Sequence, residues 1–300
     1  MSAPPAASSR QTAQSHTAAI GLMCAAVSLF AFLDATAKYL VSVKGLPVIE
    51  VVWLRFVVNA LLTFAIVSPM ALPRLIRTAR PGHQALRSLF MLGATVFNFA
   101  AVKYLQLDQT VTIFFLTPLL VAALAGPLLG EWVGWRRLLA ILSGFLGVLL
   151  VTRPGFGGIH WAVTFSFCAT LSYALYNIST RYLAGHDPTE VTLFYSPAAG
   201  LILTMPFALL GWVWPADLLS WVLLASLGIL GGAGHWLLIL AHRTAPAPVL
   251  SPFVYVGLVW MTLLGYLMFG DVPSPWTLAG GAIVILSGLY LLYRERSKAT

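Results

Sequence analysis

Long apolar runs separated by short polar connections dominate the chain. The runs are apolar on every side and about 20 residues long, which is the length that a helix needs to cross a bilayer. Strands of a membrane barrel would instead alternate apolar and polar residues over about ten positions. The pattern therefore predicts an all-α integral membrane protein. We expect ten transmembrane helices, over residues 17–41, 47–69, 83–103, 109–129, 135–152, 160–183, 189–212, 218–241, 247–268 and 275–293.

Polar segments flank these runs. Residues 1–16 are rich in Ser, Ala, Pro and Gln and are too polar to enter a bilayer, so we expect a disordered cytoplasmic tail there. Residues 297–300 are expected to form a short cytoplasmic tail at the other end. The run over 17–41 is too long for the apolar region of a signal peptide and is followed by another span. It is therefore interpreted as the first helix.

The composition narrows the class of protein further. The chain has 59% hydrophobic and 9% charged residues, whereas soluble domains carry about 25% charged residues. This excludes a soluble enzyme of ordinary surface, a disordered protein and a secreted disulfide scaffold. Cys24 and Cys168 both lie in apolar runs and indicate neither a disulfide framework nor a metal site. We expect no cofactor and no metal.

The basic residues predict the orientation of the chain. Lysines and arginines gather in the cytoplasmic connections of membrane proteins. If the N-terminus is cytoplasmic, that side holds Arg10, Arg74, Arg77, Arg80, Arg87, Arg136, Arg137, Arg181, Arg243, Arg294, Arg296 and Lys298. The other side then holds only Lys38, Lys44, Lys103 and Arg153. The asymmetry explains the net charge of +8 without nucleic acid, and predicts cytoplasmic termini in a bacterial-type inner membrane.

Two halves of the chain resemble each other at an offset of about 140 residues. The matches keep one order: Cys24–Ser28 with Cys168–Ser172, Lys38–Leu40 with Arg181–Leu183, Leu128–Glu131 with Leu267–Asp271, and Ser143–Gly144 with Ser287–Gly288. Each copy contains five predicted spans, so the second copy enters the membrane inverted relative to the first. Inverted repeats are typical of secondary transporters, which bind substrate where the repeats meet. We predict repeats over residues 17–155 and 156–296.

These features together resemble the drug/metabolite transporter superfamily, EamA type. The resemblance rests on the duplicated five-helix unit, on Gly130-Glu131 and Gly270-Asp271 after the fourth helix of each copy, and on Leu54-Arg55-Phe56. The chain is similar to bacterial amino-acid exporters of the YddG type, which export aromatic and some other amino acids. The resemblance implies a central cavity lined by the helices over 17–41, 83–103, 109–129, 160–183, 218–241 and 247–268. It also implies a peripheral layer, which could face a dimer partner, formed by the helices over 135–152 and 275–293.

Few charges fall deep inside the predicted spans. Asp34 and Arg55 lie roughly 10 Å and 12 Å from the outer ends of two adjacent antiparallel helices, by the 1.5 Å rise per residue. Lys38 lies one helical turn from Asp34. One hypothesis makes Asp34 a proton site or an anchor for a substrate ammonium group. The other makes Asp34–Arg55 or Asp34–Lys38 a buried structural pair.

Two prolines interrupt predicted spans in corresponding positions of the two copies. Pro118 lies within 109–129 and Pro252 within 247–268, and each removes one backbone hydrogen bond and should kink its helix. Both are interpreted as gating hinges, with a static packing kink as the alternative. The acidic residues Glu131 and Asp271 follow these helices, where capping of the next helix and a gate role both remain open.

A small amphipathic ligand requires apolar and aromatic walls with a few polar groups. Most tryptophans lie at helix ends, where the aromatic belt of membrane proteins explains them. The resemblance assigns the remaining polar and aromatic candidates to cavity helices. The predicted substrate site consists of Asn98, Tyr173, Tyr176, Asn177, His235, Trp236, Ser251 and Tyr255.

Several other functions were weighed against transport. The chain contains no metalloprotease or serine-hydrolase motif and no ATP-binding glycine loop, which argues against an intramembrane enzyme and against direct ATP drive. A channel would usually need rings of charge or a carbonyl filter, and an accessory membrane subunit remains an alternative. The sequence favours a secondary transporter working by alternating access, driven by facilitated diffusion or proton exchange. Its expected partners are a small-molecule substrate such as an amino acid, and the lipid bilayer. The transporter would be a monomer or a homodimer.

Overall fold

The computed structural model describes residues 6–66, 72–129, 135–152, 160–183, 185–244 and 250–299. These residues form helices and connections and contain no strand, so the all-α class is confirmed. The first half contains α1 (Ala6–Lys38), η1 (Tyr39–Val43), α2 (Val48–Ile66), α3 (Leu72–Leu75), α4 (Pro81–Tyr104), α5 (Leu107–Phe114), α6 (Thr117–Leu129) and α7 (Trp135–Thr152). The second half contains α8 (Val163–Leu183), α9 (Thr189–Tyr195), α10 (Ala198–Leu210), α11 (Leu218–Thr244), η3 (Ser251–Tyr255), α13 (Val256–Phe269) and α14 (Pro275–Ala299).

Some of the helices are long and apolar enough to cross a membrane. By length and composition these are Thr17–Val43, Val48–Ala65, Pro81–Tyr104, Glu190–Leu210 and Leu218–Ala241. Shorter apolar helices cover Leu107–Val121, Leu138–Val151, Phe253–Phe269 and Pro275–Tyr290. The described residues thus contain five clear apolar spans, and the count of ten stays a prediction.

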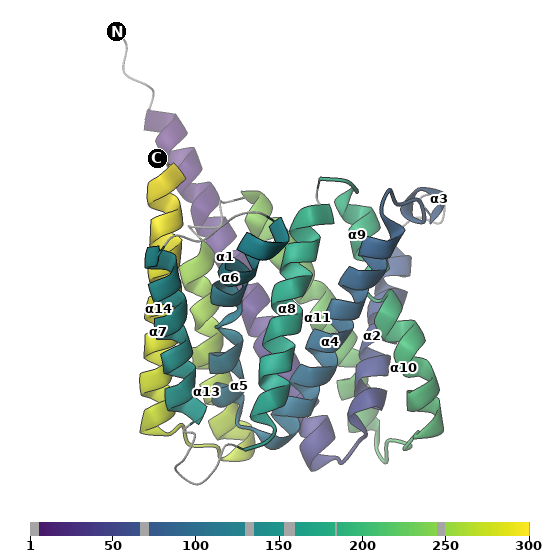
Figure 1. Cartoon of the computed structure of the whole chain (residues 1–300). Coiled ribbons are helices and arrows are strands. Elements are labelled where there is room, and N and C mark those ends of the chain that lie inside the picture. The colour runs from purple at the N-terminus through teal and green to yellow at the C-terminus, as the bar shows by residue number, and fades with distance from the viewer. Residues whose placement is uncertain are drawn as a thin grey trace.

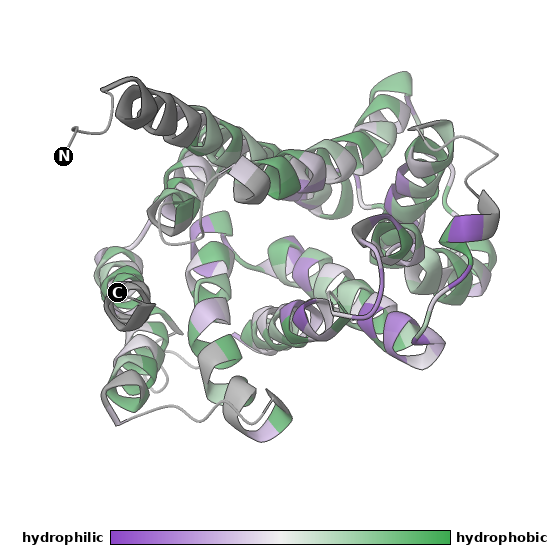
Figure 2. Ribbon diagram, turned by 90° about the horizontal axis from the view of Figure 1, so that it is seen from above, coloured by the Kyte–Doolittle hydropathy of each residue, from purple (hydrophilic) through white to green (hydrophobic). Residues whose placement is uncertain are grey.

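The helices stand side by side, and successive long helices run in opposite directions (Figure 1). The start of α1 and the end of α14 lie at the same end of the bundle (Figure 1). In the packing, α1 lies mainly against α11 and α4 mainly against α8, while α7 and α14 pair with each other at one edge (Figures 1 and 2). The polar cluster described below links α1 to α4.

Apolar residues cover the outside of the bundle as well as its core. Seen from above, the helices are largely in the colour that marks hydrophobic residues (Figure 2). Large exposed side chains include Ile202, Phe207, Leu210 and Leu218, whose outward faces would be unfavourable in water. Such an extended apolar exterior marks a membrane-facing surface.

The span predicted over 109–129 is broken. It is divided into α5 and α6 by a turn at Phe115 and Leu116, just before Pro118. Pro118 has no N–H to donate to the carbonyl oxygen of Phe114. The Thr117 hydroxyl donates to that oxygen instead, at 2.6 Å. The break therefore leaves no unsatisfied carbonyl at Phe114, and this carbonyl is not free for a substrate.

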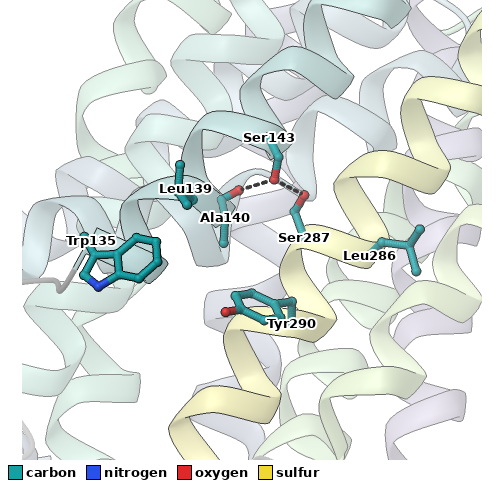
Figure 3. Close-up of a pocket in the computed structure, with 7 residues that line it drawn as sticks. All are labelled: Trp135, Leu139, Ala140, Ser143, Leu286, Ser287 and Tyr290. Carbon is teal, nitrogen blue, oxygen red and sulfur yellow. Dashed lines mark hydrogen bonds between the residues drawn. The ribbon is translucent and has the colours of Figure 1, made fainter.

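The edge pair of α7 and α14 shows the closest helix approach. A Cβ added at Gly280 would collide with the carbonyl oxygen of Gly147, so both helices need glycine at this crossing. Ser143 and Ser287, which match in the sequence repeat, lie within hydrogen-bond distance of each other at 2.8 Å (Figure 3). A groove of about 550 Å³ beside them is lined by Trp135, Leu139, Ala140, Ser143, Leu286, Ser287 and Tyr290 (Figure 3). Its serine hydroxyls already bond to each other, which leaves the buried polar cluster as the stronger candidate for a solute site.

Candidate functional site

A polar cluster joins α1, α2 and α4 inside the bundle. The Asn98 side-chain amide of α4 donates to the Asp34 carboxylate of α1, at 2.9 Å. Arg55 of α2 donates from Nη1 to the Thr95 hydroxyl of α4, at 2.7 Å. Asp34 and Arg55 interact electrostatically, but they form no direct ion pair among the residues that the structure describes. The predicted Asp34–Arg55 pair is thus replaced by two separate contacts to α4.

The Arg55 guanidinium is buried between aromatic rings. It lies 5.6 Å from the ring centroid of Phe56 and 5.5 Å from that of Phe99. On the α11 side it meets Gly231, where an added Cβ would stand 3.4 Å from Nε and 3.5 Å from Nη2. The guanidinium therefore lies against α11 at Gly231, where even an added Cβ would be at ordinary contact distance from it.

A second buried arginine, Arg87 of α4, ties α4 to α8 and α9. It donates from Nε to the Thr180 hydroxyl at 2.7 Å and from Nη2 to the Tyr176 hydroxyl at 2.6 Å. Its Nη1 donates to the Ser196 hydroxyl and to the Thr192 carbonyl oxygen. The distribution of basic residues predicts that Arg87 lies on the cytoplasmic side, but its exposed fraction is only 3%, so the guanidinium is buried in the bundle.

One signal in the sequence could have identified Arg87. Gln84, Arg87, Ser88, Thr95 and Asn98 recur at helical spacing and form one polar face of α4. A polar face on a membrane-crossing helix must meet partners inside the bundle. The face was missed because Arg87 lies near the start of its helix, where a cation is usually counted with the preceding connection.

The aromatic candidates of α8 form a stack beside this cluster. Tyr176 and Tyr173 have ring centroids 5.7 Å apart, and Tyr173 lies 4.8 Å from Phe114 of α5. The Asn177 amide donates to the Tyr173 carbonyl oxygen of its own helix at 2.7 Å. Tyr173 and Tyr176 therefore lie against Phe114 and Arg87, while the bond from Asn177 is local, and their place in the substrate site stays a prediction.

The candidates of α11 separate onto two faces. His235 contacts Phe30 of α1 edge to face, with ring centroids 5.0 Å apart, and interacts electrostatically with both buried arginines. Trp236 is 59% exposed and shares its face with the exposed Ile229 and Leu240. Its assignment to the substrate site stays a prediction, and a place on this exposed apolar face is the alternative.

The candidates around η3 lie apart from the cluster. Tyr255 packs edge to face on Phe115 at 5.0 Å and against Gly288 of α14, within an apolar part of the core. Pro252 belongs to the 3-10 turn that precedes α13 rather than to the middle of a continuous α-helix. The side chains of Ser251 and Pro252, and the whole of Glu131, lie outside the described residues.

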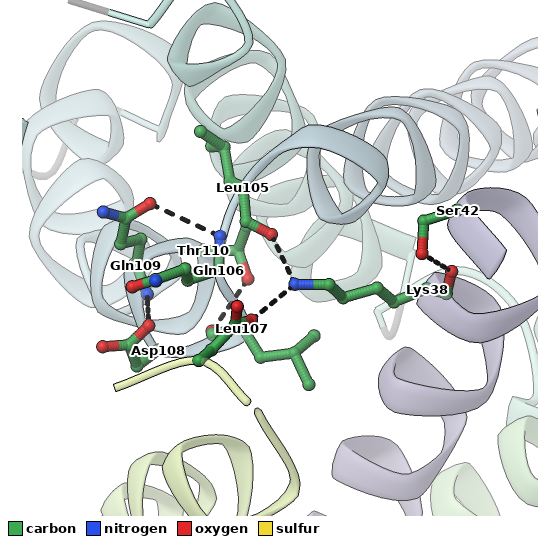
Figure 4. A network of polar contacts seen from close by, with 9 residues as sticks. Lys38, Ser42, Leu105, Gln106, Leu107, Asp108, Gln109 and Thr110 are labelled. Atoms are coloured by element: carbon green, nitrogen blue, oxygen red, sulfur yellow. Dashed lines mark hydrogen bonds and ion pairs between the residues drawn. The ribbon is translucent and has the colours of Figure 1, made fainter. Parts of the chain in front are cut away.

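Lys38 crosses from the end of α1 to the other half of the chain. Its ammonium lies 2.7 Å from the Asp271 carboxylate. The ammonium donates to the Leu105 carbonyl oxygen at 3.0 Å (Figure 4). It also lies 4.6 Å from the ring centroid of Phe269. The helical spacing suggested Asp34 as the partner of Lys38. That prediction is wrong, because the partner is Asp271. Asp271 does not cap α14 either, because the Ser274 hydroxyl accepts the Thr277 N–H there.

Comparison with known proteins identifies the family. The model of the EamA-like transporter family matches residues 17–153 and 160–294. The chain belongs to the EamA-like transporter family. It is therefore a multi-pass membrane protein of the transporter type.

Curated relatives of this EamA-like chain differ in their named substrates. It is 26% identical over 275 residues to a riboflavin transporter of Vibrio cholerae, which covers 90% of this chain and 91% of the relative. An S-adenosylmethionine uptake transporter of Rickettsia prowazekii is 25% identical, with 88% of each chain covered. A pseudopaline exporter of Pseudomonas aeruginosa is 23% identical, with 90% and 95% covered. None of these three is named for the aromatic amino acids that the sequence suggested.

A solved structure shares the fold of this EamA-like transporter. It aligns with a TM-score of 0.62 over 93% of this chain and 98% of the other, at 22% sequence identity. Identity at this level establishes the fold alone.

The EamA-like chain has a second ion pair at the Lys38 end of the bundle, between Lys44 and Asp217. The hydrogen bond that Lys44 donates to Asp217 lowers the pKa of Asp217 from 3.8 to about 2. The same contact raises the pKa of Lys44 above 10.5. Because the carboxyl pKa is lower in the folded state, the pair stabilises the fold above about pH 4, and this stabilisation is lost as the pH falls through about 2.

Substitution of Asp217 tests this linkage. We expect wild type to melt at a slightly higher temperature than Asp217→Asn near neutral pH, and the difference to shrink between about pH 4 and pH 2. Thermal denaturation in detergent across this range measures it. The same substitution made in a Lys44→Gln background should leave a smaller pH-dependent difference, because only the Ser220 N–H then donates to Asp217. A constant difference down to pH 2 would contradict the assignment.

Proposed function

We propose that this EamA-like transporter moves a small organic metabolite across a bacterial-type inner membrane by alternating access. The substrate binds beside Asp34, Arg55, Asn98, Tyr176 and His235. The observation that carries this proposal is the presence of opposite charges on adjacent helices that bond to α4 instead of to each other. Such unpaired intramembrane charges are costly and mark solute sites.

Two inverted five-helix repeats, over residues 17–155 and 156–296, are part of this proposal. The two separate matches of the family model, over 17–153 and 160–294, support a duplicated unit. An odd number of spans in each copy would invert the second copy. Cytoplasmic termini follow in this proposal from the excess of arginines on the side of the chain ends.

Amino acids are the substrate class that we favour, because the cluster offers a carboxylate for an ammonium group and a guanidinium for a carboxylate. The stack of Tyr176, Tyr173 and Phe114 offers an apolar surface for a side chain. The named substrates of the relatives, riboflavin and S-adenosylmethionine, favour another class of metabolite as the alternative.

The breaks at Pro118 and Pro252 are proposed as the hinges of the alternating motion. At Pro118 the backbone lacks one helical bond and the Thr117 hydroxyl has replaced it, so the chain can bend there without leaving a bare carbonyl. Pro252 lies in a short 3-10 turn before α13, which is a second interruption of regular helix.

Flux from proteoliposomes tests the proposed function. We expect saturable movement of at least one labelled compound among phenylalanine, methionine, threonine, glutamate, riboflavin and S-adenosylmethionine. Asn98→Ala should slow this flux about tenfold, because Asp34 then loses its hydrogen-bond donor. Ile229→Ala, on the exposed face of α11, is the matched control and should leave the flux unchanged. If no compound crosses faster than through protein-free liposomes, the proposal is overturned.

A further inference from the structure

The charges around Tyr176 do not balance. Arg87 donates to the Tyr176 hydroxyl and its guanidinium carbon lies 4.3 Å from the ring centroid, while Arg55 interacts electrostatically with the same tyrosine. His235 interacts electrostatically with both guanidinium groups. Two permanent cations and a histidine therefore converge from α2, α4 and α11.

Only one carboxylate opposes them within the described part of the chain. Asp34 is the acidic group that acts on Arg55, and the main electrostatic neighbours of Arg87 are Tyr173 and Tyr176. Neither arginine forms an ion pair with a described residue. The carboxylate of Asp187, near the start of α4, is taken by the Thr78 hydroxyl, the Ala79 N–H and the Gln84 amide. A buried charge without a counter-charge is strongly unfavourable. One of the two positive charges therefore requires a negatively charged partner from outside the chain.

The two arginines differ in what they can offer to such a partner. Arg87 uses Nε and both terminal nitrogens on Thr180, Tyr176, Ser196 and Thr192, so its fork is occupied. Arg55 has five N–H groups and donates to one described acceptor, Thr95. An incoming anion would therefore bind Arg55, while Arg87 contributes its charge and holds Tyr176 in place.

We propose that the transported solute has a net negative charge and that its carboxylate binds Arg55 beside Tyr176 and His235. This inference rests on the proposed function and narrows its substrate class. A neutral amino acid would leave the excess positive charge uncompensated. An organic acid, or an amino acid with a second acidic group, compensates it, and the stack of Tyr176, Tyr173 and Phe114 receives its apolar part.

Two labelled compounds with one carbon skeleton test the sign of the charge. Phenylalanine is a neutral zwitterion at pH 7, whereas phenylpyruvate has the same ring and carboxylate without the ammonium group. In proteoliposomes we expect phenylpyruvate to move about tenfold faster than phenylalanine at equal, subsaturating concentration. Faster flux of phenylalanine would overturn the inference and leave the proposed function standing. Absence of flux for both compounds and for the amino acids and cofactors above would overturn the proposed function itself.

Two substitutions of opposite sign separate recognition from structural damage. Arg55→Gln should lower the phenylpyruvate flux about 30-fold or more and reverse the preference between the two compounds. Asp34→Asn removes the opposing carboxylate and should raise the ratio of phenylpyruvate to phenylalanine flux. A general loss of folding would lower both fluxes together and leave their ratio unchanged, so an unchanged ratio in both variants would overturn the role of these charges. Lys44→Gln, which removes a partly exposed cation at the end of the bundle, is the matched control.

Discussion

Arg87→Met is expected to lower the free energy of unfolding by about 3 kcal/mol or more, because hydrogen bonds from a charged donor contribute about 1.5–3 kcal/mol each. The substitution keeps a long side chain but removes the four hydrogen bonds that Arg87 donates to Thr180, Tyr176, Ser196 and Thr192. The loss also frees the Tyr176 ring, which rests on the guanidinium. Unfolding in mixed detergent micelles measures the effect.

Two further variants serve as comparisons for Arg87→Met. Arg87→Lys keeps the charge but cannot form the planar fork, so it should recover only part of the lost stability. Arg77→Met removes an exposed arginine of the α3–α4 connection and should change stability by less than about 0.5 kcal/mol. Equal effects of Arg87→Met and Arg77→Met would show that the buried network does not hold α4 against α8.

Asp271→Asn is expected to destabilise the protein by about 3–5 kcal/mol, because it leaves the ammonium of Lys38 buried without its carboxylate. The side chains of this pair are only 9% and 20% exposed, so water cannot replace the lost partner. The Leu105 carbonyl and the Phe269 ring remain, but neither carries a negative charge. The melting temperature in detergent should fall accordingly.

A charge swap makes the Lys38 prediction specific. Lys38→Asp alone should be at least as damaging as Asp271→Asn, since it places two carboxylates together. Lys38→Asp combined with Asp271→Lys restores opposite charges and should recover part of the stability, which a double-mutant cycle quantifies. Additive losses in the double variant would mean that the two residues do not stabilise each other. Asp217→Asn, in the exposed pair at the same end, should have little effect.

The helices were predictable because a membrane requires every backbone group to be satisfied within its own segment. Apolar runs of sufficient length therefore identified α1, α2, α4 and α11 directly. The breaks were less predictable. Pro118 was expected to kink one helix, yet it separates α5 from α6, and Pro197, which was given no such role, follows the end of α9. A proline removes a helical bond in either case, but only neighbouring helices decide how far the chain bends.

The sequence pattern could not predict which residues contact the buried charged side chains. Asp34, Arg55 and Asn98 were recognised as internal from their positions in apolar runs. Lys38 was paired with Asp34 because local spacing is visible in a sequence, while Asp271 lies 233 residues away. Trp236 and His235 lie on different faces of α11 because adjacent residues of a helix differ by about 100° in direction, and no polar pattern in the sequence distinguished the two faces.

The separation of Lys38 from its carboxylate has a consequence for biosynthesis. Ribosomes add roughly 5–20 residues per second, so the 233 residues up to Asp271 take roughly 10 to 50 seconds. During that interval the Lys38 ammonium lacks the carboxylate with which it forms its ion pair. The Leu105 carbonyl is only 67 residues away and is made much earlier. In the nascent first half, Lys38 can therefore donate to this oxygen. Once Asp271 has been synthesised, its carboxylate forms the ion pair that joins the early helices to the late ones.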